Sequence, residues 1–260
     1  MLTARPAPAE EASVPHRLFG HVDAADTGYS AARWADEARA AIAATLAQGR
    51  LPVLVGGTGL YLRTLLDGIA PVPAIPMDVR DAVRAMPVAT AHADLARLDP
   101  PAAARLNPAD TTRVARALEV IHATGRPLAD WQGEKVGGIG DAIMLAPVIL
   151  LPDRSWLFER IDARTNAMMQ GGATAEVAAL LARSDLAADA PIRRAIGVAP
   201  IAAYLDGTLS QAEATAAIAL ATRQYAKRQY TWFRRQPPES WVRTADDKTA
   251  TQQFEIMLLK

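Results

Sequence analysis

The stretch LPVLVGGTGLYLRTLLDG, residues 51–68, decides the fold class. The apolar run over 51–55 is bounded by turn signals, which predicts a short buried strand. Two glycines at 56–57 interrupt the run, and leucines at helical spacing then predict a helix that ends at Gly68. A helix is also predicted over 31–48. Helix, strand, glycine loop and helix form the repeating unit of a parallel α/β sheet.

The composition is that of an ordinary globular protein. Half of the 260 residues are hydrophobic, 22% are charged, and the formal net charge is zero. No apolar run approaches the ~18 residues of a membrane span, and the first residues lack the apolar segment of a signal peptide. The chain has no cysteine, which excludes disulfides and thiolate metal sites. We therefore expect a cytoplasmic monomer with no membrane partner.

The middle of the chain has a different texture. Prolines cluster over 71–76 and predict a linker, after which short helices follow without a convincing strand. The clearest helix begins in NPADTTRVARALEVIHATG, where Asn107 is the expected N-cap and a glycine marks the end. We expect an all-helical insertion over 76–140, within an α/β core made of 1–75 and 141–260.

The second part of the core is predicted to be mostly helical. Residues 143–151 predict a buried strand, and SWVRT at 240–244 predicts a short edge strand. Asp153 is the expected cap of one helix. The S-x-x-E pattern of Ser210 and Glu213 is a capping box that opens a long helix through about residue 235. A last helix is expected to reach the C-terminus.

The long helix carries an unusual concentration of positive charge. The stretch RQYAKRQYTWFRR, residues 223–235, has five basic residues and no acid. Arg223, Lys227, Tyr230 and Arg234 recur at spacings that place them on one face. Like charges repel, so the pattern favours a phosphate-rich partner. The alternative is a face that is paired with acids from elsewhere in the fold.

The glycine loop at 56–59 has two interpretations. Glycines let backbone N–H groups approach an anion, the following helix offers its positive end, and Thr58 adds a hydroxyl. The alternative is a tight strand-to-helix turn that binds nothing. The sequence contains no G-x-x-x-x-G-K-[ST] loop, and its four histidines lack the spacing of metal ligands.

Two arginine pairs leave their roles open. Arg113 and Arg116 share a helical face with Glu119, which fits contacts with a nucleic-acid backbone or an ordinary surface Arg–Glu pair. Arg160 and Arg164 lie four residues apart, as in an anion clamp or a solvated helix face.

Several motifs together resemble one family. In chain order they are PHRL, YSAARW, LVGGTGLYLRTLLDG, NPADTTRVARALE, ERIDAR, RRAIG followed by YLDG, and ATRQYAKRQYTWFR. They cover nearly the whole chain and resemble the tRNA dimethylallyltransferases, also called tRNA isopentenyltransferases. The resemblance implies a P-loop-NTPase-like parallel-sheet core with an all-helical insertion. It implies transfer of a dimethylallyl group from dimethylallyl diphosphate to the exocyclic amine of the adenine 3′ of the anticodon in tRNA. It also implies Mg²⁺ as a cofactor.

The resemblance further implies roles for individual residues. Catalytic roles are implied for Thr58 and Arg164, and diphosphate binding for Gly56, Gly57, Arg164 and Arg223. Contacts with tRNA are implied for residues of the insertion, of a turn at 194–197 and of the basic helix: Arg80, Thr112, Arg113, Val114, Ala115, Arg116, Arg194, Ala195, Ile196, Gly197, Lys227, Arg228, Gln229, Tyr230, Thr231, Trp232, Phe233 and Arg234.

The chain departs from the family pattern in two places. Family members begin with a strand, a G-x-T-x-x-G-K-[ST] loop and a D-S-x-Q segment, whereas Met1 here lies just before TARP, which resembles the stretch that follows. We therefore expect an N-terminally truncated core that lacks roughly 50 residues, including the proposed base and the hydroxyl that meets Mg²⁺. Such a chain is expected to transfer nothing by itself. The explanations are a misassigned start, a degraded gene, or a tRNA-binding remnant without catalysis. The second departure is Val198-Ala199, where the family has an aromatic and a basic residue.

Overall fold

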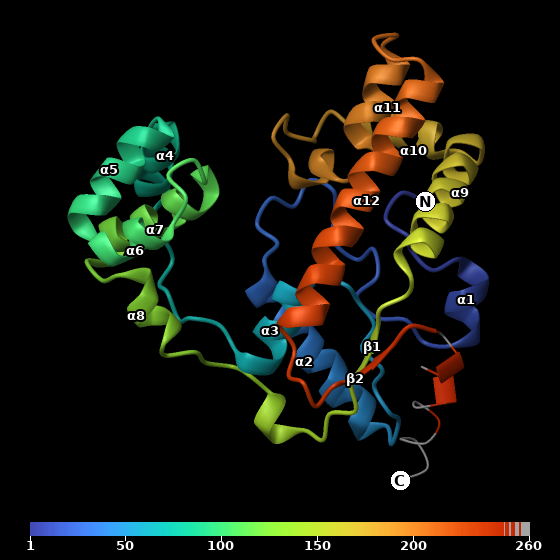
Figure 1. The fold of residues 1–260 in the computed structure, drawn as a ribbon, viewed down its shortest axis with the longest axis horizontal. Helices are drawn as coiled ribbons and strands as arrows, with labels where there is room; N and C mark the ends of the chain where they lie inside the picture. Colours follow the sequence, from blue (N-terminus) through green and yellow to red (C-terminus); the bar gives the residue numbers. More distant parts are fainter. Residues whose placement is uncertain (247, 250, 253–254, 256–260) are drawn as a thin grey trace. The chain divides into compact units, whose positions relative to one another are not determined.

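The computed structural model describes residues 1–246, 248–249, 251–252 and 255. They belong to two compact units (Figure 1). The first unit joins Met1–Leu62 to Met144–Lys260, and the second is Arg63–Ile143. The chain thus leaves the first unit and later returns to it. The predicted insertion, 76–140, falls within the second unit.

The first unit is built from helices and one small sheet. Its elements are α1 (Pro8–Ser13), α2 (Ala31–Ala47), the start of α3 (Gly59–Asp67), β1 (Val148–Leu150), α9 (Arg154–Gln170), α10 (Ala173–Leu181), η2 (Pro191–Arg194), α11 (Val198–Leu205), α12 (Gln211–Arg235) and β2 (Val242–Thr244). Strands β1 and β2 are parallel, with Ile149 opposite Arg243. The predicted α/β class with a parallel sheet is confirmed, and the sheet has two strands in the described part of the chain.

The core of the first unit lies between its later helices. Helix α12 packs against α9 and α11, as Figure 1 shows. Seven buried residues form the cluster: Met169, Ala173, Val177, Val198, Ile201, Ala214 and Ile218. The two members of this cluster on α12, Ala214 and Ile218, are one turn apart on the same face. Both lie in the N-terminal half of the helix. The basic residues therefore occupy the half of α12 that this core does not bury.

Local capping signals predicted the helix starts well. The Ser210 hydroxyl accepts a hydrogen bond from Glu213 N, and the Glu213 carboxylate accepts one from Ser210 N. The carboxylate of Asp153 accepts bonds from the backbone of Ser155 and Trp156. Each cap satisfies N–H groups that the first helical turn leaves without partners.

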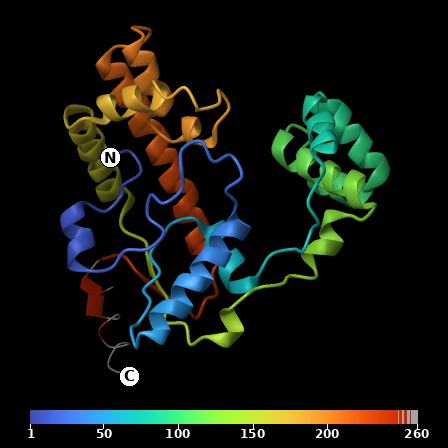
Figure 2. The same cartoon turned by 180° about the vertical axis from the view of Figure 1, so that it is seen from behind.

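The prediction of a buried strand over 51–55 is wrong. The segment is extended but belongs to no strand, and Leu51 and Val55 are 59% and 76% exposed. A strand needs a neighbour with which to pair, and within the described residues no segment forms a backbone ladder with this one. Figure 2 shows it from behind, between α2 and α3. The strand predicted over 143–151 is confirmed only at 148–150, where Ile149 is buried.

The second unit is helical, apart from one isolated bridge between Ile69 and Val136. Its elements are the rest of α3, α4 (Met77–Ala85), α5 (Val88–Leu98), α6 (Pro100–Arg105), α7 (Thr111–Thr124), α8 (Leu128–Gln132) and η1 (Gly140–Ala142). Its own core contains Leu95, Val114 and Leu118, each without measurable exposure. This unit therefore buries a hydrophobic cluster of its own.

One predicted cap in this unit is wrong. Asp110, not Asn107, caps α7, and its carboxylate accepts a bond from Arg113 N. The Asn107 side chain instead accepts a bond from Ala109 N in the preceding turn, because a short amide readily closes such a turn. The last helix that was expected near the C-terminus falls largely on 253–254 and 256–260, which lie outside the described residues.

Candidate nucleic-acid interface

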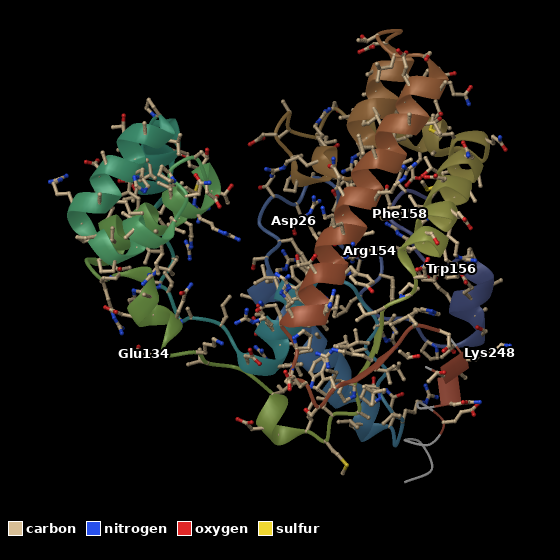
Figure 3. The ribbon with its side chains drawn as sticks, in the orientation of Figure 1. Asp26, Glu134, Arg154, Trp156, Phe158 and Lys248 are labelled. Carbon is tan, nitrogen blue, oxygen red and sulfur yellow. The ribbon has the colours of Figure 1, made fainter. Side chains whose placement is uncertain are left out.

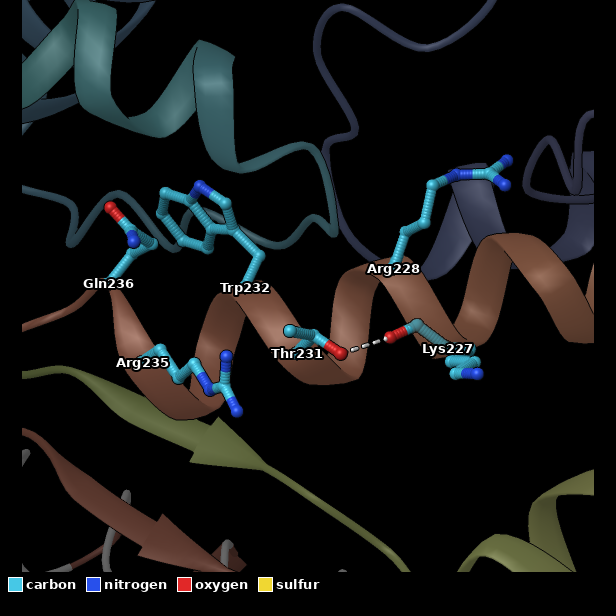
Figure 4. Close-up of a pocket in the computed structure, with 6 residues that line it drawn as sticks. All are labelled: Lys227, Arg228, Thr231, Trp232, Arg235 and Gln236. Carbon is cyan, nitrogen blue, oxygen red and sulfur yellow. Dashed lines mark hydrogen bonds between the residues drawn. The ribbon is translucent and has the colours of Figure 1, made fainter. Parts of the chain in front are cut away.

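The C-terminal half of α12 presents a groove lined with basic side chains. Six residues line about 410 Å³: Lys227, Arg228, Thr231, Trp232, Arg235 and Gln236. The Thr231 hydroxyl donates to the Lys227 carbonyl at 2.8 Å (Figure 4). This bond involves the backbone of Lys227 and not its ammonium group. Among the described residues, no carboxylate lies within ion-pair distance of Lys227, Arg228, Arg234 or Arg235. This half of α12 therefore keeps a concentrated positive charge.

Arg223, one turn earlier, is the exception on this helix. Its Nη2 and Nε donate to Asp162 Oδ1 of α9 at 2.6 and 3.1 Å. Its guanidinium also lies 5.9 Å from the centroid of the Phe158 ring. Both alternatives for the basic helix thus hold in part, because one cation is paired with an acid of the same chain and the others are not. Arg223 is less free to hold a diphosphate than the sequence suggested.

The glycine loop contacts the basic helix directly. Gln229 Nε2 donates to the Gly57 carbonyl at 2.9 Å. A Cβ added at Gly59 would lie 2.3 Å from Cδ2 of the Trp232 indole, so only glycine allows this approach. Thr58, between them, has an exposed side chain, and its carbonyl accepts the first hydrogen bonds of α3. The structure therefore places Thr58 between two glycines that contact α12.

A second groove lies at the carboxyl ends of the two parallel strands. It encloses about 480 Å³ and is lined by Leu151, Pro152, Asp153, Arg154, Tyr230, Arg234 and Ala245. The Arg154 guanidinium sits 4.8 Å from the centroid of the Tyr230 ring. Figure 3 shows Arg154 and Phe158 on the side of α9 that faces α12. This edge of a parallel sheet is where α/β proteins commonly bind ligands.

Arg164 and the turn at 194–197 line neither groove. Arg164 is exposed on α9, and its Nη2 is 3.4 Å from the Met1 carbonyl. The turn of Arg194, Ala195, Ile196 and Gly197 leads into α11, and Gly197 adopts a φ of 105° there. Helix α11 packs on the half of α12 that holds Ile218, whereas the basic groove is lined by residues of the other half. The structure does not bring this turn to the groove.

The helical unit holds a second group of arginines. Arg80 and Arg84 lie one turn apart on α4, and Arg116 lies on α7. Arg84 and Arg116 contact Glu119, whose side chain is only 3% exposed, and the charge of Arg80 acts on Arg116. Arg84 Nε donates to Glu119 Oε1 at 2.9 Å, and Arg116 Nη1 is 3.9 Å from Oε2. The Arg–Glu pair that the helical spacing suggested is present between Arg116 and Glu119, but its carboxylate is buried rather than at the surface.

Burial lowers the pKa of the Arg116 guanidinium below its usual value. Glu119 opposes this shift, whereas the charges of Arg80 and Arg84 add to it. On the same helix, Thr112 and Arg113 are exposed, but Val114 is buried in the core and its side chain offers no surface to a ligand. The sequence missed Arg84, although its position one turn after Arg80 was a usable signal.

The described residues give no support for a protein-held metal. They contain no group of three or more His, Cys, Asp or Glu side chains placed to hold an ion. We therefore assign no described residue to Mg²⁺. Within the same residues, no helix combines the length and the apolar character needed to cross a bilayer.

The first unit has a parallel sheet and a glycine loop that contacts a basic helix, and the helical unit carries clustered arginines. These features are typical of α/β proteins that bind phosphate groups and RNA. The family model described as IPP transferase matches residues 1–236, and the chain belongs to that family.

Relatives and solved structures agree with this membership. The chain is 64% identical to the tRNA dimethylallyltransferase of Sphingopyxis alaskensis, over 94% of this chain and 79% of that protein. It is 56% identical to the tRNA dimethylallyltransferase of Novosphingobium aromaticivorans, over 96% and 88%. The full-length tRNA isopentenylpyrophosphate transferase of Bacillus halodurans superposes with a TM-score of 0.65 at 29% identity, covering 99% of this chain and 82% of that one. A eukaryotic dimethylallyltransferase acting on tRNA gives 0.74 at 25% identity, covering 89% and 59%.

Proposed function

We propose that the chain transfers a dimethylallyl group from dimethylallyl diphosphate to the exocyclic amine of the adenine 3′ of the anticodon in tRNA. Membership of the IPP transferase family supports the class of reaction. One observation carries the RNA-binding part of the proposal. Lys227 and Arg228, which have no ion-pair partner among the described residues, lie on the helix that contacts the glycine loop through Gln229 and Gly57.

The basic groove suits the sugar–phosphate backbone. Lys227 and Arg228 supply charge without a competing carboxylate among the described residues, and Trp232 offers an indole on which a base can stack. Binding to the cations would release counterions and give an affinity that falls with salt. Because the same helix contacts the loop, a strand held there passes close to Thr58.

The chemistry of the transfer places a demand on positive charge. A bond forms between the adenine amine nitrogen and the terminal carbon of the prenyl group, while the bond from that carbon to the diphosphate oxygen breaks. Both electrons of the broken C–O bond leave with the diphosphate, and the amine gives up one proton to solvent water. Cations and N–H groups held in place stabilise the leaving diphosphate. We propose this role for Thr58, the two loop glycines and Arg164. Arg223 is expected to contribute less, because its guanidinium is bound to Asp162. Mg²⁺ remains an expectation of the resemblance, and no step is assigned to it.

Transfer of labelled dimethylallyl groups to an unmodified tRNA transcript tests the proposal. Label is expected on the wild-type transcript, which would overturn the sequence-based expectation that the chain transfers nothing by itself. No label is expected on a transcript with guanine at the target position, because guanine carries an oxygen where adenine carries the accepting amine. Binding of the transcript without transfer would favour the alternative, a tRNA-binding protein that does not modify its ligand. If the chain shows neither binding nor transfer, both the proposal and the alternative are overturned. A cytoplasmic monomer is part of the same proposal, and light scattering of the purified chain checks its mass.

A further inference from the structure

The arginine cluster of the helical unit has more positive charge than its own acid can balance. Arg84 and Arg116 contact the carboxylate of Glu119, and the charge of a third arginine, Arg80, acts on Arg116. Three positive charges less one negative charge leave an excess of two. Among the described residues, no other carboxylate lies within ion-pair distance of these arginines. The Nε of Arg80 is buried and has no hydrogen-bond partner within the described part of the chain.

Stability alone does not account for this arrangement. A buried carboxylate needs a partner, and Arg84 already provides a charge-assisted bond of 2.9 Å. The two further cations repel each other and Arg84, an unfavourable interaction that folding must offset. An excess of positive charge beside a buried acid is better explained by an anion that arrives from outside the chain.

The geometry of Arg84 favours a phosphate. Glu119 accepts from its Nε, so the side of the guanidinium nearest the helix is occupied. The two terminal nitrogens remain, on a side chain that is 61% exposed. Two adjacent Nη groups suit the bidentate binding of a phosphate oxygen pair. The bond to Glu119 removes rotamer freedom that binding would otherwise have to restrict.

We propose that Arg84 binds a backbone phosphate of RNA and that the buried Glu119 is the residue that positions it. This inference rests on the proposed function, because it takes tRNA as the ligand. It adds one phosphate-binding residue, Arg84, to the expected contacts of Arg80 and Arg116. It also gives the carboxylate of Glu119 a role in binding.

The salt dependence of binding tests Arg84. Affinity of the full chain for an unmodified tRNA transcript is measured by fluorescence anisotropy at several KCl concentrations. Arg84→Gln should flatten the slope of log affinity against log salt by roughly 0.7–0.9, the value for one lost phosphate contact. Arg97→Gln is the matched control, because Arg97 lies in the same unit, is 71% exposed and pairs with Asp94 at 3.3 Å. Equal slopes for the two variants would overturn the proposal.

Two substitutions at Glu119 separate positioning from net charge. Glu119→Gln and Glu119→Ala both remove one negative charge, but only glutamine keeps an oxygen that can accept from Arg84 Nε. Positioning predicts tighter tRNA binding by the glutamine variant than by the alanine variant, measured below both melting temperatures. Equal affinities would leave charge as the only effect and would refute the role of Glu119. If the alanine variant does not fold, the Arg84→Gln slope still decides.

The result for the wild-type chain distinguishes failure of the proposed function from failure of the role of Arg84. If the wild type binds no tRNA, the proposed function fails, and this inference fails with it. If the wild type binds with a strong salt dependence but Arg84→Gln leaves the slope unchanged, only the inference fails. A flattened slope that is specific to Arg84 supports both.

Discussion

Replacing Gly59 with alanine tests whether the glycine loop is fitted to the basic helix. The new Cβ would lie 2.3 Å from Cδ2 and Cε2 of Trp232 and 2.6 Å from Cε3. Non-bonded carbons normally keep about 3.5–4.0 Å, so the backbone or the indole must move by more than about 1 Å. The clashing atoms belong to the fused part of the ring, which cannot swing aside as a flexible chain end can. Overpacking of this kind costs about 1–3 kcal/mol.

Alanine also has a benefit that must be subtracted. It fixes the backbone of α3 at a smaller entropic cost than glycine, by about 0.5–1 kcal/mol. We therefore expect a net loss of about 1–2 kcal/mol in the free energy of unfolding, obtained from urea denaturation at equal m-values. Gly56→Ala is the matched control, because a Cβ there meets nothing within 4 Å. It should be neutral or slightly stabilising.

A double-mutant cycle makes the prediction sharper. Trp232→Ala removes the ring, so Gly59→Ala should lose most of its effect in that background. The Gly59→Ala variant should also bind tRNA more weakly, since Trp232 lines the basic groove. If Gly59→Ala and Gly56→Ala unfold at the same urea concentration, the contact between loop and helix is not as described.

Three further predictions concern charge. Replacing Lys227 and Arg228 together with alanine should flatten the log–log salt dependence of tRNA binding by up to roughly 1.8, since each lost phosphate contact removes about 0.9; an unchanged slope would exclude this groove as a phosphate site. Asp162→Asn frees Arg223 from its 2.6 Å partner, so tRNA affinity should rise while unfolding stability falls by at most about 1 kcal/mol; weaker binding would show that the pair itself holds the helix for RNA. Bonds from Tyr29 first, then from His21 and Arg33, lower the pKa of Glu37. The stabilisation is therefore present above the ordinary glutamate pKa of about 4.3 and lost as pH falls through the lowered value, so melting temperatures should fall more steeply with acid in the wild type than in Glu37→Gln.

Helix starts were predictable from the sequence because their determinants are local. The Ser210–Glu213 box and the Asp153 cap act within three residues of chain, and both are confirmed. Asn107 shows the limit of this reasoning. Two capping residues, Asn107 and Asp110, stand three apart, and the sequence alone does not show which of them closes the preceding turn.

Features that depend on distant residues were not predictable in the same way. An apolar pentapeptide becomes a buried strand only with neighbours on its edges, and the segment at 51–55 has none within the described residues. The pairing of Arg223 with Asp162 joins positions 61 residues apart. Glu119 looked like a surface acid because i,i+3 spacing says nothing about what covers it, and here α4 places Arg84 above it. Family motifs pointed to tRNA without revealing any of these contacts.

The isolated bridge between Ile69 and Val136 gives the helical unit a modular character. Two antiparallel segments meet there, and Gly68 and Gly138 lie close together. A Cβ on either glycine would clash with backbone atoms of the opposite segment. The chain therefore enters and leaves the unit through two segments that lie side by side. A genetic engineer could excise everything beyond these segments, bridge the gap with a short turn, and graft the excised cassette onto another scaffold, because its hydrophobic centre travels with it.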